Sequence, residues 1–135
     1  MKKNLHRIIM SALLTVVATV AASAQCYIVG SDNQWKTNAA AAELTETATA
    51  GVYEGEVTFA EGAQYFTVTQ NLTTGDDDYD WATFNQHRFG PSAPDAMLLI
   101  NEPMAMIKGK DRSFKVPTAA TTYRMPVSYT HLRAH

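Results

Sequence analysis

The chain has 135 residues, of which 46% are hydrophobic and 18% charged, and its formal net charge is −2 at pH 7. This length fits one small domain and excludes a large multidomain enzyme. The hydrophobic fraction is too high, and the charge too low, for a wholly disordered chain. A single cysteine excludes a disulfide framework. A net charge near zero disfavours nucleic-acid binding, which normally needs a basic patch.

The first 24 residues have the pattern of a bacterial export signal. Basic residues precede an apolar stretch at residues 8–20, and Ala22-Ser23-Ala24 then offers the small residues that a signal peptidase recognises. The sequence therefore predicts a signal-peptide helix at residues 1–24 and cleavage after Ala24. It predicts an exported protein that is periplasmic, extracellular or associated with the outer membrane. A retained membrane anchor is the alternative.

Cys26 lies two residues after the predicted cleavage site, which raises the question of a lipid anchor. Lipoprotein processing favours a small residue directly before the cysteine, and Gln25 occupies that position. An unlipidated lone thiol near the mature terminus is the expectation. Between residues 25 and 125 the chain carries seven Lys or Arg and thirteen Asp or Glu, a net charge of −6. This acidic balance favours neutral or cationic ligands over nucleic acid and anionic membrane surfaces.

Strand patterns dominate the predicted domain at residues 25–125. Residues 27–29 are a β-prone run, and residues 52–59 alternate apolar and polar side chains as a strand with one wet face does. Residues 64–69 are the expected hairpin partner of that strand. Helical signals are weak, and residues 38–46 have room for one or two turns. Further strands are expected at residues 81–84, 87–89, 97–100, 105–108, 113–116 and 121–125. Short strands separated by frequent turn residues predict an all-β protein with a β-sandwich.

Several segments resemble those of a known family in the same order. The run from Tyr27 to Trp35, a strand ending in Gly30 and followed by Asn-x-Trp, resembles the opening of immunoglobulin-like starch- and glycogen-binding modules. Later segments are similar to the domains of SusE/SusF-type outer-membrane starch-binding proteins, namely Gly51-Val52-Tyr53-Glu54-Gly55, Tyr65-Phe66, Arg88-Phe89-Gly90-Pro91 and the stretch 108–116.

The resemblance covers nearly all of residues 27–125. It implies an immunoglobulin-like β-sandwich of about seven or eight short antiparallel strands. It also implies a carbohydrate-binding domain that holds α-glucan chains at the cell surface. The partners that it implies are a polysaccharide or oligosaccharide and an outer-membrane glycan-uptake complex.

Sugar binding requires flat aromatic faces for the C–H groups of a pyranose ring, with hydrogen-bonding side chains around them. Trp35, Trp81 and Tyr79 are the candidate stacking residues, and Lys108 and Arg88 are the candidate hydrogen-bond donors. For Trp35, a lid over the core is an equal alternative, and for Trp81 core packing is the favoured one. Lys108 and Arg88 have the alternative of lying on a wet strand face or in a charged turn.

Motifs for metal, cofactor or catalytic chemistry are missing from the sequence. Asp76, Asp77, Asp78 and Asp80 form a dense acidic loop for which calcium is an alternative, but a solvated turn is the commoner meaning of such a charge run. The chain has no Gly-x-Ser-x-Gly motif and no phosphate-binding glycine loop. We therefore expect no enzyme, no cofactor and no metal site.

The last residues, 126–135, are atypical of a domain end. Ser128 to His135 resembles the translation of a sequencing adapter, which predicts a gene fragment with a non-native tail; a short natural basic tail is the alternative. The overall hypothesis is an exported, non-catalytic carbohydrate-binding domain that favours α-glucan. The alternative function is a structural or adhesion module that mediates protein contacts.

Overall fold

The computed structural model describes residues 9–16, 25–62, 64–117 and 121–129, and the regular structure in these ranges is nearly all β. The predicted all-β class is confirmed. The helical elements among the described residues are the 3-10 turn η1 (Ser31–Asn33) and the short helix α1 (Trp81–Phe84). The strands are β1 (Ile9–Ser11), β2 (Leu13–Val16), β3 (Cys26–Gly30), β4 (Ala42–Glu46), β5 (Val52–Thr58), β6 (Tyr65–Thr69), β7 (Arg88–Pro91), β8 (Pro103–Lys108), β9 (Phe114–Lys115) and β10 (Thr122–Ser128).

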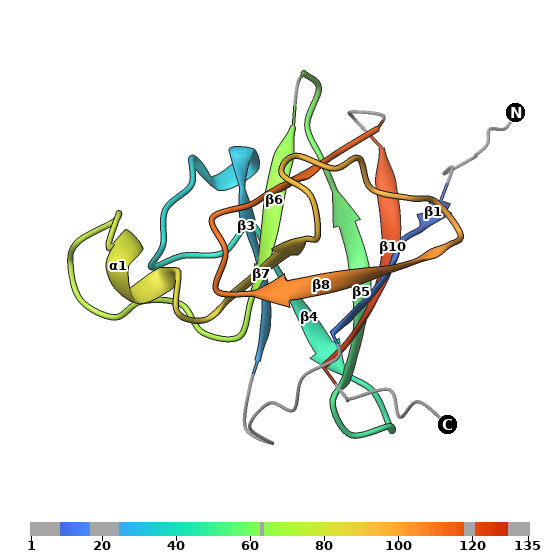
Figure 1. The fold of residues 1–135 in the computed structure, drawn as a ribbon, viewed down its shortest axis with the longest axis horizontal. Helices are drawn as coiled ribbons and strands as arrows, with labels where there is room; N and C mark the ends of the chain where they lie inside the picture. The colour runs from blue at the N-terminus through green and yellow to red at the C-terminus, as the bar shows by residue number, and fades with distance from the viewer. Residues whose placement is uncertain (1–8, 17–24, 63, 118–120, 130–135) are drawn as a thin grey trace, which may run out of the picture.

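The strands form one sheet that closes on itself, where the sequence predicted a sandwich of two sheets (Figure 1). The circuit runs β10–β5–β4–β3–β6–β7–β8–β2 and returns to β10, while β9 pairs beside β6. Closure follows from β10, which pairs with β5 on one edge and with β1 and β2 on the other. A closed sheet leaves few unpaired strand edges.

The predicted hairpin between residues 52–59 and 64–69 is wrong. The strand β5 pairs with β4 and β10, and β6 pairs with β3, β7 and β9. Their aromatic side chains meet across the interior instead, with the rings of Phe59 and Phe66 5.1 Å apart. Because four of the five side chains of β6 are buried, this strand fits a central position better than a place in a two-stranded hairpin.

Three further local predictions are wrong. The strand expected at residues 97–100 is reduced to an isolated bridge between Met97 and Lys115. The helix-friendly stretch at residues 38–46 contains strand β4, in which Leu44 is buried and its neighbours on both sides are exposed. Pairing with β3 and β5 outweighs the helix propensity of the preceding alanines. The predicted strand at residues 81–84 is the helix α1, and Asp80 caps its start by accepting a hydrogen bond from the backbone N–H of Thr83 at 3.2 Å.

The core is aromatic and fills the closed sheet. The alternation predicted for residues 52–59 is confirmed, with Tyr53, Val57 and Phe59 buried. The neighbouring strand β10 supplies Tyr123, Met125 and Val127 and leads directly to Tyr129, all of them fully buried. Ring stacking between Phe66 and Phe114, with centroids 5.2 Å apart, links β6 to β9. Large aromatic groups therefore supply much of the buried apolar area.

Cys26 is buried in this core. Burial raises the pKa of its thiol to about 12, partly offset by a hydrogen bond with Tyr129. The Tyr129 hydroxyl also donates to the carbonyl of Gln25 at 2.9 Å. Cys26 is therefore a free thiol, as the sequence predicted, and in this fold it is a core side chain that stays protonated at neutral pH.

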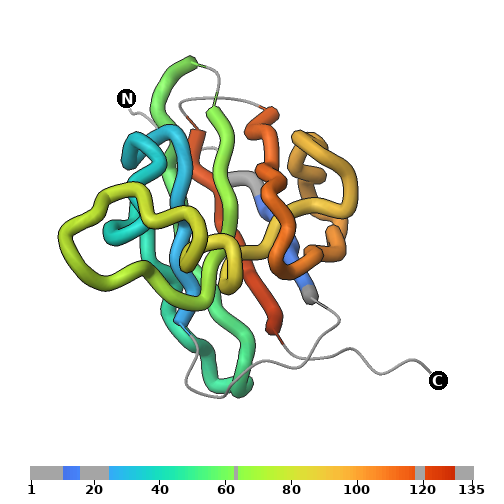
Figure 2. Tube along the Cα trace, turned by 60° about the vertical axis from the view of Figure 1, so that its left-hand side comes forward, coloured from blue at the N-terminus to red at the C-terminus, as the bar shows by residue number. Residues whose placement is uncertain are grey.

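The sheet includes residues on both sides of the predicted domain, which was expected to span residues 25–125. Residues 9–16 form strands β1 and β2, so the predicted helical conformation is wrong for this segment, while the predicted cleavage after Ala24 stays a prediction; residues 1–8 and 17–24 lie outside the described residues. Strand β10 continues past residue 125 to Ser128, and residues 130–135 of the predicted tail are outside the described part. Figure 2 shows the N-terminal strand segment next to the red β10 segment. No helix in the described ranges has the length and apolar character needed to cross a membrane.

Candidate functional site

A hollow of about 350 Å³ lies where the loop after β3, the helix α1 and the segment before β9 come together. Figure 1 shows α1 standing to one side of the sheet. The residues that line the hollow are Trp35, Trp81, Asn85, Arg88, Asp111 and Ser113. Three of the five side chains that the sequence proposed for binding, Trp35, Trp81 and Arg88, therefore meet in one place.

Trp35 stands in an unusual backbone conformation. Gln34 and Trp35 both have positive φ angles, 60° and 59°, a left-handed conformation that side chains larger than glycine and asparagine seldom adopt. The Trp35 N–H donates to the carbonyl of Gly30 at 2.9 Å, which closes the loop. Asn33 holds the same loop, since its side chain accepts from the Gly30 N–H at 2.9 Å and donates to the carbonyl of Ala39 at 3.0 Å. The chain thus holds this indole in a fixed but strained position, as functional loops often do.

Trp81 is the first residue of α1. A polar network fixes the start of the helix: the Asp80 carboxylate caps Thr83, and the Asp80 N–H donates to the Thr37 hydroxyl at 3.0 Å. The indole packs edge-on against Phe84, with centroids 5.3 Å apart. The Trp35 and Trp81 rings lie 6.2 Å apart at an interplanar angle of 47°. Neither indole belongs to the buried core of the sheet, and both are partly exposed.

Arg88 is the polar centre of the site. Its side chain is 1% exposed and its guanidinium lies 5.8 Å from the Trp81 ring and 5.7 Å from the Phe84 ring. The five N–H groups of an arginine match five acceptors here, namely Thr67 Oγ1 at 3.2 Å, Asn85 Oδ1 at 3.1 Å, Asp111 Oδ1 at 3.1 Å, the Arg112 carbonyl at 3.0 Å and Ser113 Oγ at 3.4 Å.

Burial lowers the pKa of the Arg88 guanidinium, and the nearby Asp111 carboxylate acts in the opposite direction. The group keeps its charge at neutral pH because an arginine pKa starts far above that range. Arg88 therefore positions Asn85, Asp111 and Trp81 around the hollow. The direct donation to a ligand that the sequence suggested would require Arg88 to give up one of these hydrogen bonds.

The sequence did not predict the polar side chains at the rim of the hollow, which are Asn85, Asp111 and Ser113. Asn85 follows α1, and Asp111 and Ser113 precede β9; the Asp111 side chain is 86% exposed. Asp111 was visible in the sequence as an acid among basic residues. Its pairing with Arg88, twenty-three positions earlier, depends on the pairing of β7 with β8. These oxygen-bearing side chains provide acceptors next to two apolar ring faces.

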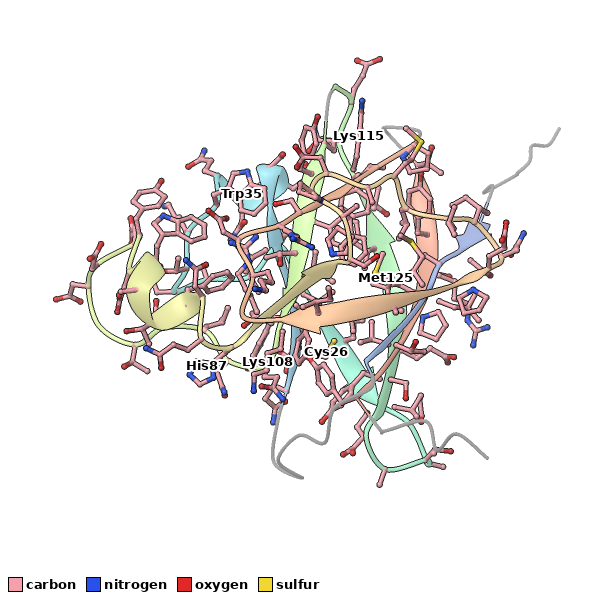
Figure 3. All side chains as sticks on the ribbon, viewed as in Figure 1. Cys26, Trp35, His87, Lys108, Lys115 and Met125 are labelled. Atoms are coloured by element: carbon pink, nitrogen blue, oxygen red, sulfur yellow. The ribbon has the colours of Figure 1, made fainter. Side chains whose placement is uncertain are left out.

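The other two proposed residues lie outside the lining of the hollow. Tyr79 is 48% exposed in the loop before α1, and its N–H donates to the Asp77 carboxylate at 2.9 Å. Lys108 lies at the end of β8 with its Nζ 5.8 Å from the ring of Phe89. Figure 3 shows Trp35 and Lys108 in different parts of the molecule. The structure does not bring Lys108 to the paired indoles.

The acidic loop at residues 76–80 is tied into the support of α1. Asp77 closes a turn onto Tyr79, Asp80 caps the helix, and Asp78 accepts a hydrogen bond from the Asn38 side chain at 3.1 Å and pairs with Lys36 at 3.8 Å. Among the described residues, no group of three or more His, Cys, Asp or Glu side chains is arranged to hold a metal ion. Asp77, Asp78 and Asp80 thus shape the loop that carries Trp81.

Comparisons of the chain with protein-family models, with curated proteins and with solved structures gave no match. The chemistry of the hollow is therefore argued from its own side chains. Two inclined aromatic faces, a charge-compensated Arg88–Asp111 pair and two further hydrogen-bonding side chains, Asn85 and Ser113, suit a neutral ligand that presents both C–H faces and hydroxyl groups.

Proposed function

We propose that this chain is an exported, non-catalytic carbohydrate-binding domain whose ligand is an α-glucan. The observation that carries the proposal is the pair of partly exposed indoles, Trp35 and Trp81, 6.2 Å apart above a hollow rimmed by Asn85, Asp111 and Ser113. The hollow, at about 350 Å³, is within the size range of small-ligand sites.

The angle between the indoles favours a curved glycan. A flat, extended polysaccharide offers sugar faces that are nearly coplanar, and it would match two parallel rings. An α-1,4-linked chain curves, so successive sugar faces are inclined to each other. Rings tilted by 47° support the second kind of ligand. Each aromatic contact is expected to contribute roughly 0.5–1.5 kcal/mol beyond the area that it buries.

The electrostatics of the rim favour a neutral ligand. Arg88 and Asp111 compensate each other through a contact of 3.1 Å, and the remaining polar groups are an amide and a hydroxyl. A strongly anionic ligand would meet the exposed Asp111 carboxylate, while the buried Arg88 already donates to protein acceptors. Hydroxyl groups can donate to the Asp111 and Asn85 oxygens without bringing a new charge into the site.

The two tryptophans of the chain both line the hollow, which makes intrinsic fluorescence a direct probe of it. We expect amylose and glycogen to shift or quench the tryptophan emission and to retard the protein in an affinity gel. Trp35→Ala and Trp81→Ala should each abolish the retardation. Tyr27→Ala, at a half-buried tyrosine of β3 outside the hollow, is the matched control and should bind as the parent does. Unchanged mobility of the parent in amylose, glycogen and a panel of other glycans would contradict the proposal.

The second candidate function is a module that mediates protein contacts. Met97 and Leu99 favour it, because they are large apolar side chains that are 47% and 41% exposed in the segment before β8. Substitution of both by Ser should leave glycan retardation unchanged if the hollow is the site. The contact module is favoured instead if the parent binds no glycan but associates with itself, and if the double variant no longer self-associates.

A further inference from the structure

Residues 9–16 fill a strand position between β8 and β10. Both β1 and β2 run parallel to β10, with Ser11 opposite Arg124 and Leu14 opposite Val127, so one register continues through both strands. On its other edge β2 runs parallel to β8, with Leu14 opposite Met104. Figures 1 and 2 show this N-terminal segment alongside β10.

This strand contributes to the core by simple alternation. Ala12 and Leu14 are fully buried and belong to the hydrophobic cluster, while Ser11, Leu13 and Thr15 are only partly buried. Main-chain contacts add to the packing: the Ala12 N–H donates to the Arg124 carbonyl at 2.9 Å, and the Asn101 N–H donates to the Ser11 carbonyl at 2.6 Å. Such backbone bonds hold a strand without specifying most of its side chains.

The same residues lie inside the segment that the sequence predicts to be removed by cleavage after Ala24. Without them β10 keeps its pairing with β5, and β8 keeps its pairing with β7. The β2 strand is the link that closes the circuit between β8 and β10 in the described part of the chain. Its removal would open the sheet, leave two strand edges unpaired and uncover the core beside Met106 and Val127.

We propose that the position between β8 and β10 is a strand-acceptor site, which binds an extended strand of another polypeptide once residues 1–24 are removed. The seated segment defines the chemistry of the partner. The partner strand runs parallel to β10, carries no charge and presents a small residue and then an aliphatic residue at alternate inward positions, as Ala12 and Leu14 do. This inference rests on the predicted cleavage and is independent of glycan binding at the hollow.

The test uses the full chain with a specific protease site placed within residues 17–24. The protein is folded, cut, and mixed with a fluorescent peptide that has the sequence of residues 9–16 and added lysines for solubility. We expect the cut protein to take up the peptide, seen as a rise in fluorescence anisotropy, and to melt at a higher temperature with excess peptide. The uncut protein should take up none, because its own strand occupies the site.

Two peptide variants at adjacent leucines make the test specific. Leu14→Asp places a charge on the inward face and should abolish uptake, whereas Leu13→Asp places it on the partly exposed face and should retain most of the uptake. Equal effects of the two changes would overturn the proposal. So would a cut protein that loses residues 9–16, keeps its native spectrum and takes up no peptide. A cut protein that unfolds on losing the segment supports the proposal if added peptide restores the fold, and contradicts it if peptide does not.

Discussion

Arg88 carries the most heavily bonded polar side chain of the site, and its replacement by methionine tests the energetics of the hollow. The change removes five hydrogen bonds from a side chain that is 1% exposed. Removing one partner of a buried ion pair commonly costs 3–5 kcal/mol, because the other charge stays buried. Here the partner, Asp111, is 86% exposed and regains water, so that penalty does not apply in full.

The remaining loss comes from the more buried acceptors. Thr67 Oγ1 keeps its own 2.7 Å hydrogen bond to the Phe89 carbonyl, whereas the Arg112 carbonyl loses the hydrogen bond that it accepts from Arg88. At about 1 kcal/mol for each lost hydrogen bond to a buried group, and less for the exposed ones, Arg88→Met should lower the free energy of unfolding by about 2–3 kcal/mol. The Trp81 ring also loses its cationic neighbour, so glycan retardation should weaken in the variant that still folds.

Urea unfolding followed by far-UV circular dichroism measures this change, with Arg124→Met as the matched control. Arg124 is 53% exposed and pairs with Glu54 at 2.7 Å, and an exposed pair of this kind contributes roughly 0–1 kcal/mol. The two variants should therefore differ clearly in urea midpoint at an equal slope. Equal destabilisation by both, or a loss of less than about 0.5 kcal/mol in Arg88→Met, would refute the reasoning, since typical hydrogen bonds contribute at least that much.

Three further predictions concern the core and the loops. Stability should fall as the pH rises from 9.0 towards about 12, because the Cys26 thiol ionises with its ordinary pKa of 9.0 in the unfolded chain but stays protonated in the fold. In thermal melts over this pH range, Cys26→Ala should lose less stability than the parent. An equal loss in the parent and the variant would contradict this prediction. Gly30→Ala should reduce the yield of folded protein, since an added Cβ meets the Tyr65 carbonyl and the Phe66 backbone. Gly109→Ala should show only the cost of its positive φ, because its added Cβ makes an ordinary contact of 3.8 Å with the Asn85 carbonyl. Asp80→Ala should lower stability by about 1 kcal/mol and weaken glycan retardation through loss of the α1 cap, and Asp76→Ala in the same loop should do neither.

The sequence predicted the fold class from local patterns but could not predict how the strands pair. The alternation of β5 was readable because every second side chain faces the core. Its partners were not readable, since pairing with β10 joins residues more than sixty positions apart and the adjacent β6 offers an equally good hairpin pattern. The strand conformation of residues 9–16 was not readable either, because an apolar run fits both a helix and a buried strand.

The site shows the same division between local and long-range information. Trp35, Trp81 and Arg88 were proposed as separate candidates from residue type and resemblance, and the closed sheet brings them to one hollow. The N-cap of α1 had a local signal, because aspartate is a favoured N-cap residue and Asp80 directly precedes Trp81 in the sequence. Asn85, Asp111 and Ser113 had no local signal, because their role depends on the buried Arg88 that holds them together.

Glycan binding at the paired indoles is tested most directly by titrating the folded protein with amylose while its tryptophan emission is recorded. The emission should change and saturate, since both tryptophans line the hollow. Trp35→Phe and Trp81→Phe should keep part of the affinity, and Trp35→Ala and Trp81→Ala should lose it, because stacking requires a ring face at each position. An emission spectrum that stays constant up to the solubility limit of the glycan, in a protein with a cooperative thermal transition, would contradict the proposed site.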